Sequence, residues 1–398
     1  MGLGAPRLAG ARAVASSVNL DQADDESAMT ARTRRLRDGV LNHQRSALAQ
    51  AVTLVESTHP ARRAQAQLLL TSLQRHVRAK EGQRARPTMR LGISGSPGVG
   101  KSTFIEAFGQ HLLGSGLRLG VLTVDPSSTI TGGSILGDKT RMPVLSAHPD
   151  AYVRPSPSSG SLGLSLPSSL AYLLWYRCSF RMIQLLARNT TDAIVLCEAF
   201  GADVVLVETV GVGQSEVAVA DMVDMFILLL PPAGGDELQA AFDQNGVLHM
   251  LSNRQGIKRG IMEVSDLIII NKADGDLTQA AHRARVEHQN ALHLMRRKSR
   301  NWDPEVVATS ALEHRGISEV KDVIDSFYDA MMASGELMER RSNQYERWMW
   351  RHVQDDLMQR FHQHDGVKAL LPEITRQMRE RTMTPGVAAE HLIATFTA

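Results

Sequence analysis

A nine-residue glycine-rich segment constrains the fold of this chain more than any other feature. It runs from Gly95 to Thr103 and reads GSPGVGKST, which fits the pattern G-x-x-x-x-G-K-[ST]. A short, mainly apolar run at 91–94 precedes it, and a helical pattern that begins at Phe104 follows it. Strand, glycine-rich turn and helix form the context in which this pattern holds phosphate groups. The sequence therefore predicts a nucleotide-binding protein.

Each residue type in this segment suits one part of a nucleoside triphosphate. Glycines lack a Cβ, so the backbone can bend sharply and present its N–H groups to phosphate oxygens. We expect Lys101 to carry its charge to the β- and γ-phosphates, and the Ser102 hydroxyl to ligate Mg²⁺. The residues predicted to bind the nucleotide here are Gly95, Ser96, Pro97, Gly98, Val99, Gly100, Lys101, Ser102 and Thr103.

Short apolar runs that alternate with helical stretches predict an α/β fold. The strands are expected at 91–94, 119–124, 204–207, 225–230 and 267–270. Near-continuous apolar runs are typical of parallel strands that are buried on both faces. The predicted fold is a P-loop NTPase, with a parallel sheet flanked by helices and helical extensions at both ends. In such sheets, ligands bind at the carboxyl ends of the strands.

Several polar residues follow these expected strands. Asp125 and Glu208 each come directly after an apolar run, where a carboxylate suits a Mg²⁺-linked position. Gly211 would let a backbone N–H approach the γ-phosphate, and Gln214 is a candidate for orienting water. Asp138 lies in the glycine-rich loop TGGSILGDKTRM and is either a metal contact or an ordinary solvated loop residue.

A second motif, N-K-x-D, follows the expected strand at 267–270. The Asp274 carboxylate can accept both the ring N–H and the exocyclic amine of guanine. Adenine offers no matching pair of donors, so the motif favours GTP over ATP. Asn271 would brace the neighbouring loop, and the stem of Lys272 could lie over the base. Backbone N–H groups near the base oxygen could come from Ser310, Ala311 and Leu312.

With 398 residues, the chain has room for two or three domains. Its first twenty residues fit a mitochondrial transit peptide or a bacterial-style tail, and either reading excludes them from the fold. The region from 30 to about 84 reads as two helices, with Leu41, Leu48, Val52 and Val55 on one face. We therefore divide the chain into a disordered or targeting segment at 1–29, a helical extension at 30–86, a GTPase domain at 87–320 and a helical dimerisation region at 321–398.

Composition excludes several other classes of protein. The formal net charge of +2 leaves no overall signature for binding nucleic acid or an anionic membrane. No apolar run is long enough to span a bilayer. The two cysteines form neither a C-x-x-C pair nor a disulfide framework, which fits a reducing compartment. A stripe at Met349, Val353, Leu357 and Phe361 predicts a helix face that belongs to the core or to a subunit interface.

Taken together, the motifs closely resemble one family. The segments that carry the resemblance are GSPGVGKST, VDPSS, TGGSILGDKTRM, ETVGVGQSE, PPAGGDELQ, GIKRGIMEVSDL, NKADGD and SALEHRGI. They are similar to the GTPase chaperones of adenosylcobalamin-dependent methylmalonyl-CoA mutase, in the metallochaperone branch of the SIMIBI-type P-loop GTPases. The likeness runs from about residue 90 to residue 317.

The resemblance implies a Mg²⁺-dependent GTPase that holds GTP or GDP, with Lys101, Asp138 and Gln214 in the catalytic machinery. It places Lys101 on phosphate and Ser102, Asp125, Asp138 and Glu208 around Mg²⁺. It also places Asn271, Asp274 and 310–312 around guanine. Family members form homodimers through helical extensions, bind the mutase, gate its cofactor loading and protect or rescue it. No nucleic acid or membrane partner is implied. The expected location is the mitochondrial matrix, or the cytoplasm if the chain is bacterial.

Two stretches depart from the family pattern, at 164–186 and 240–254. Each reads either as a lineage-specific elaboration or as intron sequence. The second falls in the loop that the family uses as a switch against its mutase partner, so partner-stimulated hydrolysis depends on it.

Three other functions stay open at this point. A nickel- or cobalt-insertion GTPase of the same class would predict a histidine-rich tract or paired cysteines, which the sequence lacks. An ATP-dependent kinase acting on transport proteins would predict a preference for ATP. A GTP-binding module without hydrolysis would show binding but no turnover.

Overall fold

A computed structural model of the chain describes residues 27–57, 59–81, 86–124, 142–155, 188–209, 214–232 and 260–397. These residues divide into two compact units. One comprises the chain up to Pro87 together with Val195–Gly201, and the other comprises Thr88–Ile194 and Ala202–Ala398. None of the helices in these ranges is both long and apolar enough to cross a membrane.

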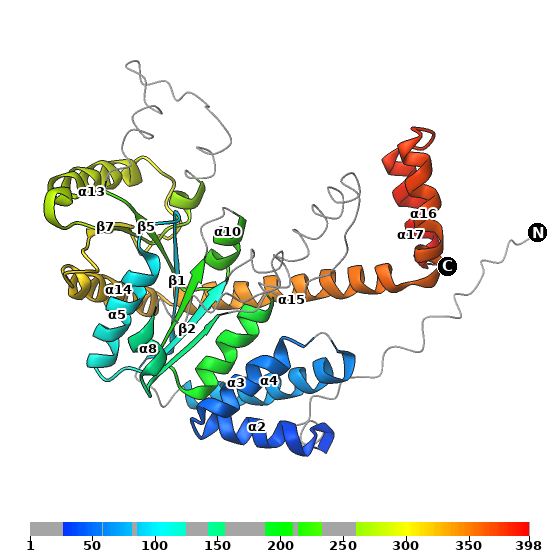
Figure 1. Cartoon of the computed structure of the whole chain (residues 1–398), viewed down its shortest axis with the longest axis horizontal. Coiled ribbons are helices and arrows are strands. Elements are labelled where there is room, and N and C mark those ends of the chain that lie inside the picture. Colours follow the sequence, from blue (N-terminus) through cyan, green and yellow to red (C-terminus); the bar gives the residue numbers. More distant parts are fainter. Residues whose placement is uncertain are drawn as a thin grey trace, which may run out of the picture. The chain divides into compact units, whose positions relative to one another are not determined.

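The second unit is built on one parallel sheet (Figure 1). The strand order in this sheet is β3-β2-β4-β1-β5-β6-β7. The strands are β1 (Met89–Gly95), β2 (Leu119–Val124), β3 (Ala151–Pro155), β4 (Val204–Thr209), β5 (Met225–Leu230), β6 (Leu267–Ile270) and β7 (Glu305–Ala308). The five predicted strands and the predicted α/β class are confirmed. The predicted list missed both edge strands. Strand β3 pairs with β2 and carries Arg154 instead of a continuous apolar run. Strand β7 pairs with β6 and begins at the exposed Glu305, which leaves only Val306–Ala308 as an apolar run.

Helices cover both faces of this sheet. On one face, α5 (Lys101–Gly114) and α14 (Ile317–Ala333) bury Phe104, Phe108 and Phe327 in the main core. On the other face, α10 (Gln214–Ala220) packs on β1, where a Cβ added to Gly92 would lie 2.9 Å from Val219. Other helices of this unit include α8 (Pro143–Ala147), η1 (Gly275–Leu277) and α13 (Thr278–His293).

Three helices continue the chain after α14. They are α15 (Glu336–Gln363), α16 (Asp365–Arg379) and α17 (Pro385–Thr397). The start of α15 is fastened to the sheet by Arg341, whose guanidinium donates to Asp224 Oδ1 at 2.9 Å and to Asp224 Oδ2 at 2.6 Å. Asp224 precedes β5, is fully buried, and also accepts bonds from the Arg90 N–H and the Tyr328 hydroxyl.

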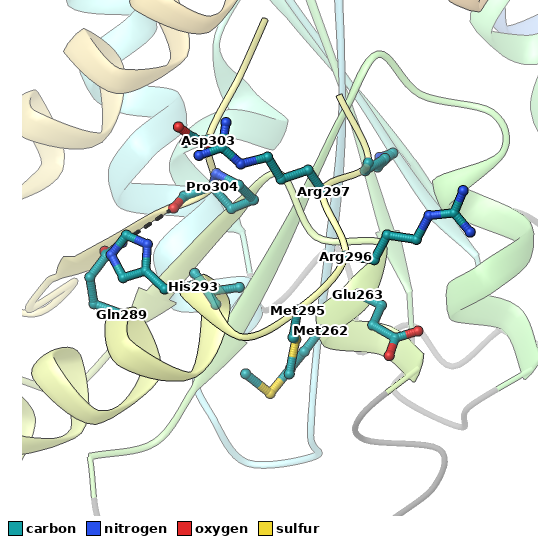
Figure 2. A pocket seen from close by; sticks show the side chains of 11 residues that line it. Met262, Glu263, Gln289, His293, Met295, Arg296, Arg297, Asp303 and Pro304 are labelled. Atoms are coloured by element: carbon teal, nitrogen blue, oxygen red, sulfur yellow. Dashed lines mark hydrogen bonds and ion pairs between the residues drawn. The ribbon is translucent and has the colours of Figure 1, made fainter. Parts of the chain in front are cut away.

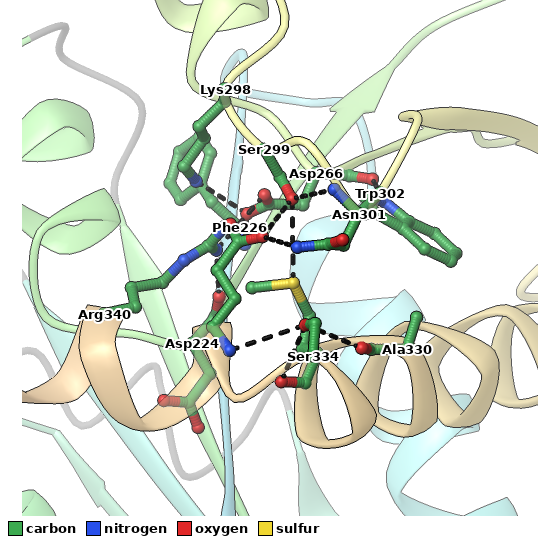
Figure 3. Close-up of polar contacts among 12 residues, drawn as sticks. Asp224, Phe226, Asp266, Lys298, Ser299, Asn301, Trp302, Ala330, Ser334 and Arg340 are labelled. Atoms are coloured by element: carbon green, nitrogen blue, oxygen red, sulfur yellow. Dashed lines mark hydrogen bonds and ion pairs between the residues drawn. The ribbon is translucent and has the colours of Figure 1, made fainter.

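A neighbouring group of polar residues joins the start of α15 to the residues that precede β6 (Figure 3). Arg340 donates to the Asp224 carbonyl at 2.6 Å and to Asp266 Oδ1 at 3.3 Å. Asp266 precedes β6 and also accepts a bond from Lys298 Nζ at 2.7 Å. At the first turn of α15, Glu336 accepts bonds from Ser299 and Asn301. The amino ends of β5 and β6 are therefore tied to the first turns of α15.

Farther along α15, three residues of the apolar stripe predicted from the sequence are exposed on this chain, namely Met349, Val353 and Leu357. The fourth, Phe361, is half-buried and packs against Phe396 of α17. Met349 and Leu357 are 51% and 52% exposed, while the neighbouring Trp348 is 7% exposed. The alternative that placed the stripe in the core of the chain is therefore wrong. Periodicity identifies the apolar face of a helix but not what covers it. The other alternative, that this stripe forms a subunit interface, stays a prediction.

Within residues 31–81 the first unit contains three helices, whereas the sequence predicted two. They are α2 (Ala31–Leu41), α3 (Arg45–Val55) and α4 (Pro60–Glu81). The chain turns between α2 and α3 at His43, which has a φ of 57°. Leu41 and Leu48 are seven residues apart, a spacing that also fits one continuous helix, so the pattern concealed the turn. The core residues shared by these helices include Val40, Leu48, Leu69 and Leu73.

Candidate nucleotide site

The phosphate loop leaves the sheet at the end of β1 and enters α5, as the sequence predicts. Gly100 forms the N-cap of α5 with a φ of 93°, in the left-handed region that favours glycine. A Cβ at this position would lie 2.7 Å from the Asn271 side-chain nitrogen. A Cβ on Gly95 would lie 2.5 Å from the Leu229 carbonyl oxygen. The tight loop therefore depends on glycine at both positions, and it directs the N-terminus of α5 towards the site.

Lys101 is the first residue of α5 and turns back over the loop. Its Nζ donates to the Gly95 carbonyl at 2.7 Å and to the Ser96 carbonyl at 3.3 Å. The side chain is buried. Its ammonium therefore lies inside the loop, where a phosphate group would meet it.

Ser102 and Glu208 come together between α5 and the end of β4. The Ser102 hydroxyl donates to Glu208 Oε1 at 3.1 Å. Glu208 is 9% exposed and lies beside β1, where its Cα is in register with Ile93. A hydroxyl and a carboxylate are the oxygen ligands that Mg²⁺ prefers, so these two residues fit the metal that the sequence predicts.

The structure does not cover every predicted site residue. Asp125, Asp138 and Gly211 lie outside the described residues. Gln214 begins α10, but its side chain is not among those described. In the described part of the chain, no group of three or more His, Cys, Asp or Glu residues could hold a metal ion.

The N-K-x-D motif lies directly against the phosphate loop. Asn271 Nδ2 donates to the Val99 carbonyl at 2.9 Å, and Thr309 donates to Asn271 Oδ1 at 3.3 Å. Lys272 has a φ of 63°, and its Nζ donates to the Gly98 carbonyl at 2.7 Å. The predicted bracing role of Asn271 matches this geometry. The motif, which follows β6, therefore contacts the phosphate loop through Asn271 and Lys272 and contacts the end of β7 through Thr309.

Asp274 faces the turn that follows β7. Ser310 Oγ donates to Asp274 Oδ2 at 2.6 Å, and the Ala273 N–H donates to the Thr309 carbonyl at 2.9 Å. Ala311 is buried and Leu312 is 74% exposed. The ends of β6 and β7 are thus joined, and the Asp274 carboxylate is held by the first residue of the predicted S-A-L segment.

Sequence reasoning missed the residues that lie behind the phosphate loop. Ser94 Oγ donates to Glu216 Oε1 at 2.8 Å and accepts a bond from Thr209 Oγ1 at 3.0 Å. All three residues are buried. One signal was available, because Glu216 lies three residues before Val219 and therefore on the apolar face of α10.

A pocket in this unit lies at the end of the sheet that is opposite to the candidate nucleotide site (Figure 2). Its lining includes Met262, which comes before β6, and Pro304, which comes directly before β7. Strands in this sheet run parallel, so the pocket lies at their amino ends, whereas the phosphate loop and the N-K-x-D motif follow their carboxyl ends. This pocket is separate from the candidate nucleotide site.

The parallel sheet, the glycine loop with its lysine, and the adjoining N-K-x-D motif define a P-loop GTPase. Comparisons with known proteins agree. The model of the family described as "Methylmalonyl Co-A mutase-associated GTPase MeaB" matches residues 48–174 and 182–365. The chain belongs to this MeaB family, and it is a GTP hydrolase. The resemblance stated from the motifs is therefore confirmed.

Individual relatives match nearly the whole chain. The mouse protein "Methylmalonic aciduria type A homolog, mitochondrial" is 46% identical over 91% of this chain and 79% of its own length. The Escherichia coli protein "GTPase ArgK" is 40% identical over 92% of this chain and 96% of its own. A crystal structure titled as a LAO/AO transport system kinase is 33% identical, covers 95% of this chain and 99% of its own, and has a TM-score of 0.61.

The two stretches that depart from the family pattern differ in this comparison. The family match is interrupted at 175–181, inside the stretch 164–186, whereas 240–254 lies within the matched range. Both stretches lie outside the described residues.

Proposed function

We propose that this GTPase binds GTP and Mg²⁺ at the phosphate loop and acts as a chaperone of an adenosylcobalamin-dependent methylmalonyl-CoA mutase. The observation that carries the nucleotide part is the hydrogen bond from Asn271 to the loop carbonyl of Val99, because it brings the predicted base motif into contact with the phosphate loop. The chaperone part is supported by the name of the family to which the chain belongs.

In this proposal, each end of the nucleotide has its own residues. Lys101 exchanges its bonds with loop carbonyls for bonds with the β- and γ-phosphates, and the N-terminus of α5 supplies further positive potential. Asp274 accepts the ring N–H and the amine of guanine, and Ser310 keeps its carboxylate oriented. The backbone at 310–312 meets the base oxygen.

Ser102 and Glu208 would hold Mg²⁺, with Asp125 and Asp138 as the further ligands that the family resemblance implies. The bound ion would neutralise charge on the β- and γ-phosphates. Lys101, Asp138 and Gln214 then act by positioning and by charge stabilisation, because phosphoryl transfer to water requires no covalent enzyme intermediate.

The partner, the assembly and the location are further parts of the proposal. Exposed Met349, Val353 and Leu357 on α15 supply an apolar stripe that suits a homodimer interface. Light scattering on the purified protein tests this, and a monomer at all concentrations would exclude it. Mouse and Caenorhabditis elegans relatives are named as mitochondrial, which supports the mitochondrial matrix, with the cytoplasm as the location if the chain is bacterial.

One relative gives a specific reason to test a kinase function, since the similar crystal structure is titled as a transport system kinase. A kinase of this kind would use ATP. Adenine would leave the Asp274 carboxylate without the pair of donors that guanine offers, so the site geometry favours GTP.

The direct experiment is phosphate release from GTP and from ATP by the purified protein. We expect turnover of GTP and little turnover of ATP. Lys101→Ala should abolish turnover, because it removes the charge that meets the phosphates, whereas the exposed Lys368→Ala serves as a matched control and should retain it. A preference for ATP would contradict the proposal.

A further inference from the structure

A buried carboxylate lies behind the phosphate loop, at a position that the proposed function does not use. Glu216 on α10 is 4% exposed. Its Oε1 accepts the bond from Ser94 Oγ at 2.8 Å, and Ser94 precedes the first glycine of the loop. Thr209, at the end of β4, donates to Ser94 at 3.0 Å. The chain of hydroxyls therefore ends on this carboxylate.

The packing of α10 fixes where the carboxylate lies. Because Gly92 has no side chain, Val219 and Val223 approach the backbone of β1 closely, and a Cβ there would lie 2.9 Å from each. Glu216 lies one helical turn before Val219 and therefore faces the same strand two residues later, at Ser94.

Only one oxygen of the Glu216 carboxylate takes part in the hydrogen bond with Ser94, so this bond by itself does not explain why a charged residue is buried here. Glu216 Oε2 is buried and has no hydrogen-bond partner among the residues that the structure describes. Burial raises the pKa of Glu216, while the bond from Ser94 and the positive charge of Lys101 act in the opposite direction. Lys101 reaches the same strand end as Glu216, because its Nζ donates to the carbonyl of Gly95, the residue directly after Ser94. Its positive charge therefore acts on the buried carboxylate.

Lys101 is also the residue that the nucleotide phosphates must recruit. A carboxylate behind the loop and a phosphate in front of it are like charges that interact with the same ammonium. In a buried setting their repulsion is screened less than in water. The Glu216 carboxylate therefore weakens the interaction of Lys101 with the phosphate, and the phosphate weakens the interaction of Lys101 with Glu216.

We propose that Glu216 sets the nucleotide affinity of this GTPase, by competing with the phosphates for Lys101 and so keeping GDP release fast. The inference rests on the proposed nucleotide site at Lys101. It assigns to α10 a role in product release. A purely structural glutamate would affect binding in the opposite direction, because its loss would disturb the loop and weaken binding.

The test is the equilibrium dissociation constant and the dissociation rate of a fluorescent GDP analogue. Glu216→Gln keeps an oxygen that can accept from Ser94 but removes the charge, so we expect about tenfold tighter binding and a slower dissociation rate. Glu216→Asp keeps the charge and should stay within about threefold of the wild type on the same grounds. Glu319→Gln, on the exposed side of α14, is the matched control.

Thermal unfolding of each variant shows whether it is folded, and Glu216→Met repeats the removal of charge if the glutamine variant is unstable. Unchanged or weaker GDP binding in a folded neutral variant would overturn the inference. Equal effects of Glu216→Gln and Glu216→Asp would also overturn it, because the charge would not be the cause. Failure of the wild type to bind GDP would instead contradict the proposed nucleotide site itself.

Discussion

Asn271 donates a hydrogen bond of 2.9 Å to the carbonyl of Val99, a residue 172 positions earlier in the chain. The same side chain accepts a bond from Thr309 at the end of β7. One amide therefore connects three strand ends, and the residues expected to read the base also shape the loop expected to hold the phosphates.

This relationship predicts that Asn271→Ala weakens nucleotide binding by roughly tenfold, even though the role of Asn271 is to brace the loop. The variant leaves the Val99 carbonyl buried without its donor, at a cost of about 1–3 kcal/mol. Isothermal titration with GDP measures the affinity. Asn290→Ala on the exposed side of α13 is the control and should bind as the wild type does. Equal affinities in all three proteins would show that the amide does not brace the site.

Gly100→Ala should abolish nucleotide binding in a protein that still folds. The new Cβ would meet the Asn271 nitrogen at 2.7 Å, and the φ of 93° disfavours alanine. Gly114→Ala, at the other end of α5, is the matched control because a Cβ there meets nothing within 4 Å. We expect the control to bind normally. Normal binding by Gly100→Ala would mean that the loop is not the phosphate site.

Asp274→Asn should move the base preference from guanine to xanthine. An amide offers one donor and one acceptor where the carboxylate only accepts, and xanthine carries a carbonyl in place of the guanine amine. Competition of GDP and XDP for the fluorescent analogue measures the change. Asp276→Asn, two residues later and exposed, should leave the preference for guanine unchanged. If Asp274→Asn retained the guanine preference, this carboxylate would not contact the base.

The buried pair of Asp224 and Arg341 should contribute strongly to stability. Burial on its own would raise the pKa of Asp224, but Arg341, Arg90 and Tyr328 outweigh it and lower that pKa. Asp224→Asn leaves Arg341 buried without its counter-charge and should lower the free energy of unfolding by about 3–5 kcal/mol.

Urea unfolding measures this loss, and the half-exposed Asp221→Asn, whose longer ion pairs lie at the surface, should cost less than about 1 kcal/mol. Because the folded-state pKa of Asp224 is lowered, its stabilisation is fully present above the unfolded pKa of about 3.9 and is lost as the pH falls through the folded-state pKa. A wild-type stability that does not fall in this acidic range would contradict the assignment.

Much of the sheet could be predicted from the sequence because its strands are buried on both faces. Met225–Leu230 and Leu267–Ile270 contain no polar residue, and their predicted bounds were correct. By contrast, β1 and β4 extend beyond the predicted ranges 91–94 and 204–207. The phosphate loop and the N-K-x-D motif were likewise found by position, since each follows such a run. Edge strands β3 and β7 and the turn at His43 lack that signal, so the structure was needed to reveal them.

The polar residues behind the site could not be predicted in the same way. Ser94 ends an apolar strand and Glu216 lies in a short helix, and nothing in their spacing shows that they meet across 122 positions. Asp224 and Arg341 are 117 positions apart and join only once the sheet and α15 are formed. Long-range pairs of this kind depend on tertiary packing and leave no local pattern in one sequence.

The most direct measurement of the central claim is the GTP turnover of the purified protein, alone and with a methylmalonyl-CoA mutase, with ATP as the nucleotide control. We predict slow turnover of GTP by the protein alone and a marked stimulation by the mutase. Deletion of 240–254 in a parallel assay shows whether that stretch limits the response. Turnover of GTP that the mutase leaves unchanged, with and without the deletion, would contradict the chaperone function, and a preference for ATP would contradict the nucleotide assignment as well.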